Sequence, residues 1–216
     1  MNAQRILQRV AIVTAALLLT GCVTRKPYDY TTYRQHPPRS ILVLPPLNES
    51  TAVEATYSYL STTTRPIAEM GYYVFPVALV DQLLKENGMP GAGEMHQVPL
   101  NKVAEIIGAD AVLYITIESY GSKYQVVNSA TIVAAKARLV DTKTGIVLWE
   151  GTVRQQQNSG GSGNILADLV SAAITQAVNS SVDAAHDLSH SANGTLFSEK
   201  GYGLLHGPYH PAYNKE

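Results

Sequence analysis

The sequence predicts a single α/β domain in which a mixed β-sheet of about five strands is flanked by helices. Two observations support this fold class. In the first half of the domain, short apolar runs alternate with segments of helical periodicity, and such strand–helix units require crossovers that make neighbouring strands parallel. In the second half, two extended segments are joined by a tight turn, which is the pattern of an antiparallel hairpin.

The amino terminus has the organisation of a bacterial signal peptide. Arg5 and Arg9 precede an apolar stretch at 10–19, which is too short to span a bilayer comfortably. The stretch ends in Leu-Thr-Gly and is followed by Cys22. This order resembles the lipobox of bacterial lipoproteins, in which the chain is cut before the cysteine and the thiol is diacylated. We therefore expect a signal peptide at 1–21, cleaved between Gly21 and Cys22.

Cys22 is the only cysteine in the chain and cannot form an internal disulfide. An unmodified thiol in an oxidising compartment would be reactive, whereas acylation would block the thiol and account for the presence of a lone cysteine. The alternatives are an ordinary secretory signal with a chance cysteine, or an uncleaved anchor helix. Two or three acyl chains would hold the protein at a membrane almost permanently. Val23 stands where lipoproteins of the inner membrane carry Asp, so we expect an outer-membrane anchor, with the domain in the periplasm or at the cell surface.

The rest of the chain divides into three parts. Residues 22–39 are polar, contain Pro37-Pro38 and lack periodicity, so we expect the lipidated cysteine to be followed by a flexible tether. The periplasmic α/β domain should span 40–187, and residues 188–216 should form a C-terminal tail. The formal net charge is −1, which offers no attraction for nucleic acid.

The predicted parallel half begins with a continuous apolar run, Ile41–Leu44, as in a strand buried on both faces. A helix should follow at about 54–70, and Pro66 should kink or restart it. The next predicted elements are, in order, a strand at 72–76, a helix at 77–87, a helix at 99–107 and a strand at 111–117. Because helices are expected to flank the sheet that these strands form, the sequence predicts a sandwich of two or three layers.

The predicted antiparallel half consists of strands at 126–140 and 146–153, joined by a turn at 141–145. Small and apolar residues alternate with Lys136 and Arg138 in the first of these strands, as in a sheet with one wet face. A last helix should run over 165–187. Its wide apolar stripe, filled partly by alanines, predicts a homodimer, although burial within its own domain explains the stripe equally well.

Two histidine pairs are separated by four positions, which places both rings on one face of a helix, as in a metal site. The pairs are His186 with His190 and His206 with His210. Both are weak candidates, because the first lies where a helix should end and the second lies among Gly207, Pro208 and Pro211. No acidic or cysteine partner accompanies them, so we expect neither a metal site nor a cofactor.

The sequence contains no recognisable catalytic motif, neither a Gly-x-Ser-x-Gly elbow nor His-Glu-x-x-His, and we expect a protein that is not an enzyme. Its thirteen tyrosines against two phenylalanines are typical either of a recognition surface or of partly buried packing. Many lie near loops or element ends, namely Tyr28, Tyr30, Tyr33, Tyr120, Tyr124, Tyr202, Tyr209 and Tyr213.

Several strings of residues carry a family resemblance, and together they extend over nearly all of the mature chain. They are Ser40–Pro46, Thr64–Glu69, Gly71–Asp81, Gly108–Tyr114, Leu148–Gly151 and Gly207-Pro208. In these strings the chain resembles a family of Gram-negative lipoproteins that includes a meningococcal surface-antigen candidate. The resemblance implies a domain similar to the amino-terminal part of TolB and to curli-secretion lipoproteins, and an association with envelope lipoproteins of the curli-secretion type.

These observations lead to one functional hypothesis and two alternatives. The first is an outer-membrane lipoprotein that binds proteins, without catalysis, in an envelope secretion, transport or assembly system. The membrane, through lipid on Cys22, and other envelope lipoproteins would be its partners. The second is a lipoprotein activator of a peptidoglycan synthase. The third, an enzyme or metal carrier, depends on the histidines alone.

Overall fold

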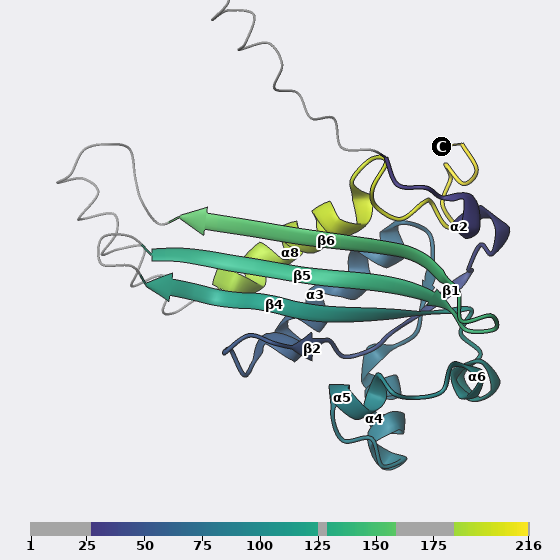
Figure 1. Ribbon diagram of the computed structural model, residues 1–216, viewed down its shortest axis with the longest axis horizontal. Helices are drawn as coiled ribbons and strands as arrows, with labels where there is room; N and C mark the ends of the chain where they lie inside the picture. The colour runs from purple at the N-terminus through teal and green to yellow at the C-terminus, as the bar shows by residue number, and fades with distance from the viewer. Residues whose placement is uncertain (1–26, 125–128, 159–183, 216) are drawn as a thin grey trace, which may run out of the picture.

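The computed structural model describes residues 27–124, 129–158 and 184–215 (Figure 1). A mixed sheet forms its centre, in the order β3-β1-β4-β5-β6, with β2 paired to β4 off this path. The strands are β1 (Ser40–Val43), β2 (Leu47–Asn48), β3 (Tyr73–Val74), β4 (Ala111–Tyr124), β5 (Ser129–Asp141) and β6 (Val147–Asn158). The predicted mixed sheet of about five strands in a single α/β domain is confirmed.

The strand pairing has the two halves that the sequence predicts. β1 is parallel to β3 and to β4, and β2 is parallel to β4. The pairs β4–β5 and β5–β6 are antiparallel. The carboxylate of Asp141 accepts hydrogen bonds from the backbone N–H groups of Lys143 and Thr144, at 3.1 and 2.7 Å, and these bonds fix the predicted turn between β5 and β6.

The predicted helices occur in the expected order, and two of those that precede β4 differ in form from the prediction. The described helices are α2 (Thr31–Gln35), α3 (Ala55–Glu69), α4 (Val77–Glu86), α5 (Ala92–Met95), α6 (Leu100–Lys102), the π-helix η1 (Val103–Ile107) and α8 (Ala184–Ser198). The expected break at Pro66 is absent, because α3 continues through it to Glu69. Pro66 removes only one backbone donor, close to the end of the helix, and the remaining bonds hold its last turn. The second difference is η1, in place of a regular helix.

The core has two parts, one on each face of the sheet. Ile41 and Val43 point to the face covered by α3 and α8, whereas Leu42 and Leu44 point to the face covered by α4, α5 and η1. All four side chains are buried, as the continuous apolar run predicts. At β5 this second face is wet, with Lys136 and Arg138 exposed. The sandwich therefore has three layers at β1 and two at β5.

Residues 27–39, which precede β1, are part of the domain, contrary to the tether expected for this part of 22–39. Helix α2 lies within this segment, and Tyr33 is only 3% exposed. The backbone N–H of Tyr28 donates to the carbonyl of Gly201 at 2.9 Å. Tyr28 and Tyr30 also pack against the core, and Tyr120 is buried. Several tyrosines near the ends of elements thus serve as packing, which gives no periodic signal in so short a segment.

The carboxyl-terminal residues also pack onto the domain, contrary to the expected tail at 188–216. Helix α8 continues to Ser198, and the segment after it lies beside α2 (Figure 1). The indole N–H of Trp149 donates to the carbonyl of Tyr202 at 2.7 Å, and Leu204 is buried. Of the helix expected at 165–187, residues 165–183 lie outside the described part of the chain. Within the described ranges, none of the helices has the length and apolar character needed to cross a bilayer.

Candidate functional site

The predicted anchor residues, Gly21 and Cys22, lie outside the residues that the structure describes. Both predicted histidine pairs belong to the described residues, and the structure brings the members of each pair together. The rings of His186 and His190 meet edge to face with their centroids 5.1 Å apart. Those of His206 and His210 stack face to face at 3.8 Å.

Neither pair has the geometry of a metal centre. The lone pairs of imidazole nitrogens lie in the ring plane, so two stacked parallel rings cannot direct them at one ion. The other pair is engaged elsewhere, since Nδ1 of His186 lies 3.1 Å from the Ser58 hydroxyl. Among the described residues, no three His, Cys, Asp or Glu side chains are grouped as metal ligands.

The contact between Ser58 and His186 joins positions far apart in the sequence, so no local pattern could have predicted it. Ser58 lies on α3, and its hydroxyl is also 2.6 Å from the hydroxyl of Tyr120 on β4. A nucleophilic serine needs a base that a third group orients, and it needs an exposed position. Ser58 is instead part of a half-buried polar junction between α3, β4 and α8, which favours a structural role.

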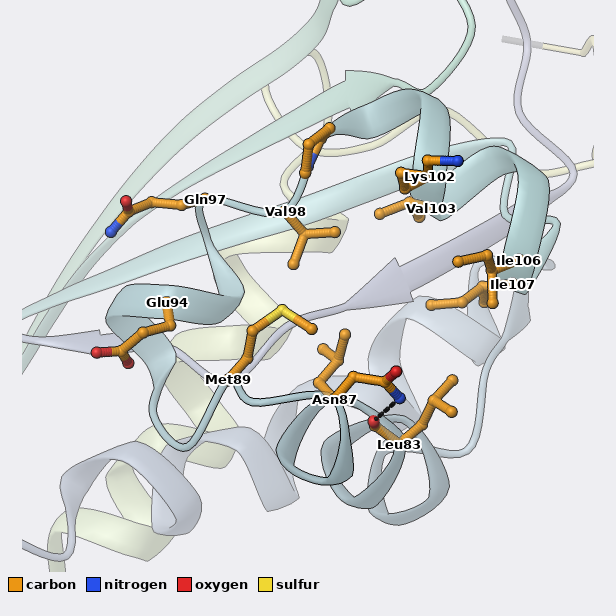
Figure 2. Close-up of a pocket in the computed structure, with 12 residues that line it drawn as sticks. Leu83, Asn87, Met89, Glu94, Gln97, Val98, Lys102, Val103, Ile106 and Ile107 are labelled. Atoms are coloured by element: carbon orange, nitrogen blue, oxygen red, sulfur yellow. Dashed lines mark hydrogen bonds between the residues drawn. The ribbon is translucent and has the colours of Figure 1, made fainter.

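An apolar groove of about 430 Å³ lies between α4 and the segment formed by α6 and η1 (Figure 2). Leu84 and Val103, both buried, belong to its floor. Leu83 and Ile106 form opposite walls and are 38% and 67% exposed. The groove is therefore open along one side, and it has the volume of a ligand or peptide site.

The π-helix explains the form of one wall. Its last bond, from the N–H of Gly108 to the carbonyl of Val103 at 3.1 Å, spans five residues in place of four. The wider turn changes the direction of the side chains that follow, and such turns are common at functional sites. Helical periodicity predicts that Ile106 is buried, yet the structure exposes it. The sequence contains no signal for this extra residue.

Polar side chains surround the groove. Asn87 donates from its amide to the carbonyl of Leu83 at 2.7 Å, which fixes it at the rim (Figure 2). Glu94 and Gln97 stand at one end and Lys102 at the other. Lys102 also pairs with Glu105 at 2.8 Å. The site thus has an apolar floor, a polar rim and an acid at one end.

The apolar surface continues along the outer side of α4. Its inward side chains, Val80 and Leu84, are buried, while Leu79 and Leu83 point outward one turn apart and are exposed. Tyr73 on the neighbouring strand β3 is 52% exposed. An exposed apolar surface with a polar rim is typical of an interaction site.

Comparison with known proteins shows a family match over most of the chain. Residues 28–209 match the family model described as "Putative lipoprotein GNA1162-like". The chain is 44% identical over 201 residues to a protein of Neisseria meningitidis serogroup B (strain ATCC BAA-335 / MC58) described as "Putative lipoprotein NMB1124/NMB1162". That alignment covers 91% of this chain and 93% of the meningococcal protein. The family match begins at residue 28, next to the first residue that the structure describes.

Two solved structures are also similar. The crystal structure of lipoprotein GNA1162 from Neisseria meningitidis is 48% identical, with a TM-score of 0.55, and covers 66% of this chain and 99% of that one. The PelC dodecamer from Paraburkholderia phytofirmans is 13% identical, with a TM-score of 0.47, and covers 79% of this chain and 89% of that one. A likeness as low as the second has no bearing on function.

Proposed function

Because the chain belongs to the GNA1162-like lipoprotein family, we propose that it is an outer-membrane lipoprotein, anchored through lipid on Cys22, which binds protein partners. Its domain is a non-enzymatic component of an envelope secretion, transport or assembly system. The single observation that carries the binding role is the open apolar groove between α4 and η1.

Substitution of Cys22 tests the proposed lipid anchor. Cys22→Ala removes the thiol that would be acylated, and we expect the variant to lose the lipid and to leave the outer-membrane fraction. Fractionation of host cells, with mass spectrometry of the first residues of the mature protein, measures both effects. A wild-type protein with an unacylated Cys22, or one that remains in the cytosol, contradicts the anchor.

The occupant of the groove that best fits its form is an amphipathic helix of another envelope protein. The groove leaves one side of its occupant in water, which suits a helix with one apolar and one polar face better than an alkyl chain. The rim has groups that can pair with the polar face, namely Asn87, Gln97 and Glu94. Since Glu94 forms no ion pair among the described residues, we expect a basic side chain of the partner at that end.

A photo-crosslinking amino acid at position 106, introduced in the host, tests this assignment. We expect a crosslink to an apolar face of a helix in a partner protein, mapped by mass spectrometry of the joined peptides. The same amino acid at Ile146, another exposed isoleucine at 40%, serves as the matched control and should not capture that peptide. Crosslinks to lipid or to a second copy, or equal capture at both positions, contradict the proposal.

Two substitutions provide a further check on the same surface. Ile106→Glu places a charge in the groove wall and should abolish capture of the partner. Ile146→Glu should leave capture unchanged. Both side chains are exposed, so neither substitution is expected to change the free energy of unfolding by more than about 0.5 kcal/mol.

The homodimer is an independent proposal, because the helix expected to form it falls mostly at 165–183, outside the described residues. Analytical ultracentrifugation of the protein in detergent measures the oligomeric state. A strict monomer at high micromolar concentration contradicts the homodimer without affecting the groove.

A further inference from the structure

A second hollow, of about 440 Å³, lies on the solvent-exposed face of the sheet, over β4, β5 and β6. Two rows of side chains that run across β4, β5 and β6 form its base. One row pairs Tyr114 with Arg138 and then with Glu150, and the other pairs Thr116, Lys136 and Thr152. His96, which follows α5, closes one side.

Arg138 is the distinctive group of this hollow. Its guanidinium carbon lies 5.6 Å from the centroid of the Tyr114 ring, an arrangement that holds the planar group in place. Within the described part of the chain, no carboxylate lies within ion-pair distance of it. Lys136 differs, because it is paired with Glu118. The hollow therefore presents one fixed guanidinium whose hydrogen-bond donors are available to a ligand.

The pKa of His96 is sensitive to the positive charge of Arg138. The Nε2 of His96 donates to the carbonyl of Pro45 at 2.9 Å, which fixes the ring beside Tyr114. Burial lowers the pKa of His96, and the charge of Arg138 lowers it further. An anion bound by Arg138 would cancel the second effect, so the pKa of His96 should rise when the hollow is filled.

We propose that this hollow binds a single carboxylate group of a ligand, with Arg138 as the binding residue. A guanidinium matches the two oxygens of a carboxylate in a planar, bidentate arrangement. The hydroxyl groups of Thr116 and Thr152 line the same hollow and offer further donors. Glu150 lines the hollow and Glu118 pairs with Lys136 beside it, so a ligand with two negative charges, such as a phosphate monoester, would be repelled more strongly than a single carboxylate.

Carboxylates of this kind occur at the ends of peptides and on acidic sugars, and two probes distinguish these sources. The probes are N-acetyl-alanyl-alanine with a free carboxylate and glucuronic acid. The amidated dipeptide and glucose are their neutral counterparts. Titration calorimetry of the full mature protein in detergent measures the affinity for each probe, and proton NMR measures the pKa of His96, which His96→Gln identifies.

We expect one of the two acids to bind and its neutral counterpart not to bind. Arg138→Gln should weaken the binding about tenfold or more, as the loss of a charged hydrogen-bond pair implies. The matched control is Arg154→Gln, an exposed arginine on β6 outside the hollow, which should leave the affinity unchanged. The pKa of His96 should rise with bound acid in the wild type and in the control, but not in Arg138→Gln.

The proposal is overturned if neither acid binds at millimolar concentration or if the neutral counterparts bind equally well. Equal affinities of Arg138→Gln and Arg154→Gln, with the wild-type rise in the pKa of His96 retained in both, also overturn it. Since Arg138 is exposed, circular dichroism of both variants should match the wild type. The test is independent of the groove at Ile106, so failure of either proposal leaves the other intact.

Discussion

Tyr59, in the middle of α3, is a buried tyrosine whose hydroxyl group has no hydrogen-bond partner among the described residues. Such a group loses its bonds to water on folding without a replacement, which costs about 1–3 kcal/mol. Burial also raises the pKa of Tyr59, because the phenolate would be even harder to desolvate than the phenol. Tyr59 therefore contributes to the core through the packing of its ring and not through its hydroxyl group.

Tyr59→Phe should therefore stabilise the protein. We expect the free energy of unfolding in urea to rise by about 1 kcal/mol, because the substitution removes an unpaired polar group and keeps the ring. Tyr57→Phe, two residues away on the same helix but 51% exposed, is the control and should change stability by less than about 0.5 kcal/mol. A clear loss of stability in Tyr59→Phe would show that the hydroxyl has a partner.

The same residue makes stability depend on pH in the alkaline range. A tyrosine in the unfolded chain ionises above about pH 10, while the raised pKa keeps Tyr59 neutral in the folded state. The unfolded state then binds fewer protons, so stability falls as pH rises. We expect the advantage of Tyr59→Phe over the wild type to be constant below pH 9 and to grow by about 1.4 kcal/mol for each pH unit above 10. A constant difference up to pH 11 would disprove this.

At the scale of elements, the end of α3 shows how the carboxyl-terminal segment is held. Gly71 ends the helix with φ +86°, and a Cβ there would overlap the backbone of His210. The carbonyl of Gly71 accepts from the N–H of Tyr209 at 3.1 Å, and that of Met70 accepts from the N–H of Gly207 at 2.8 Å. The segment therefore packs directly on this turn.

Gly71→Ala and Gly88→Ala separate backbone strain from this packing. Gly88 ends α4 with φ +83°, and among the described residues no atom beyond its immediate chain neighbours lies within 4 Å of a Cβ at that position. Gly88→Ala should cost about 1 kcal/mol, the strain of a left-handed alanine. Gly71→Ala should cost about 3 kcal/mol or more, because it adds a steric clash to the strain. Urea unfolding measures both, and limited proteolysis should cut the last residues of Gly71→Ala alone. Equal costs would show that the packing at Gly71 is unimportant.

The sequence predicts the elements better than it predicts the sites. The buried run at Ile41–Leu44 and the helix at 77–87 have strong local patterns, and both agree with the structure. The packed segments at both ends have no such pattern, because their tyrosines act one by one across long distances. The exposure of Ile106 depends on a single extra residue in a helical turn, to which hydrophobic periodicity is insensitive. The hollow at Arg138 depends on strand register, which only the paired structure supplies.

At the scale of the whole molecule, the two ends of the domain are joined through a chain of hydroxyl groups. The hydroxyl of Tyr72 donates to the carbonyl of Leu205 at 2.5 Å, so the hydroxyl of Tyr33 must be the donor in its bond to Tyr72. Tyr30 likewise donates to the carbonyl of Gly203 at 2.6 Å. The first and last segments thus stabilise one another and the core, which predicts a single cooperative unit.

Truncation after Gly201 tests this unit. Trp149 is the only tryptophan and is fully buried, with its N–H bonded to Tyr202. Loss of Leu204 from the core and of these hydrogen bonds should lower the unfolding free energy by about 2–4 kcal/mol. The emission of Trp149 should move to longer wavelength even without denaturant. Truncation after Tyr213, which removes only the last three residues, should change neither quantity, and equal behaviour of the two truncations would refute the coupling.

The position of Tyr28 limits how far the domain could lie from an anchor on Cys22. Tyr28 lies against β6, and the five residues at 23–27 that connect it to Cys22 can span at most about 20 Å when fully extended. Tyr28 lies beside β6, whereas α4 and α5 lie on the side of β4 away from β6 (Figure 1). With lipid on Cys22, as we propose, so short a connection would keep the domain close to the membrane surface and would not let it reach across the cell wall. The surface around α4 would then lie on the side of the domain away from the point of attachment.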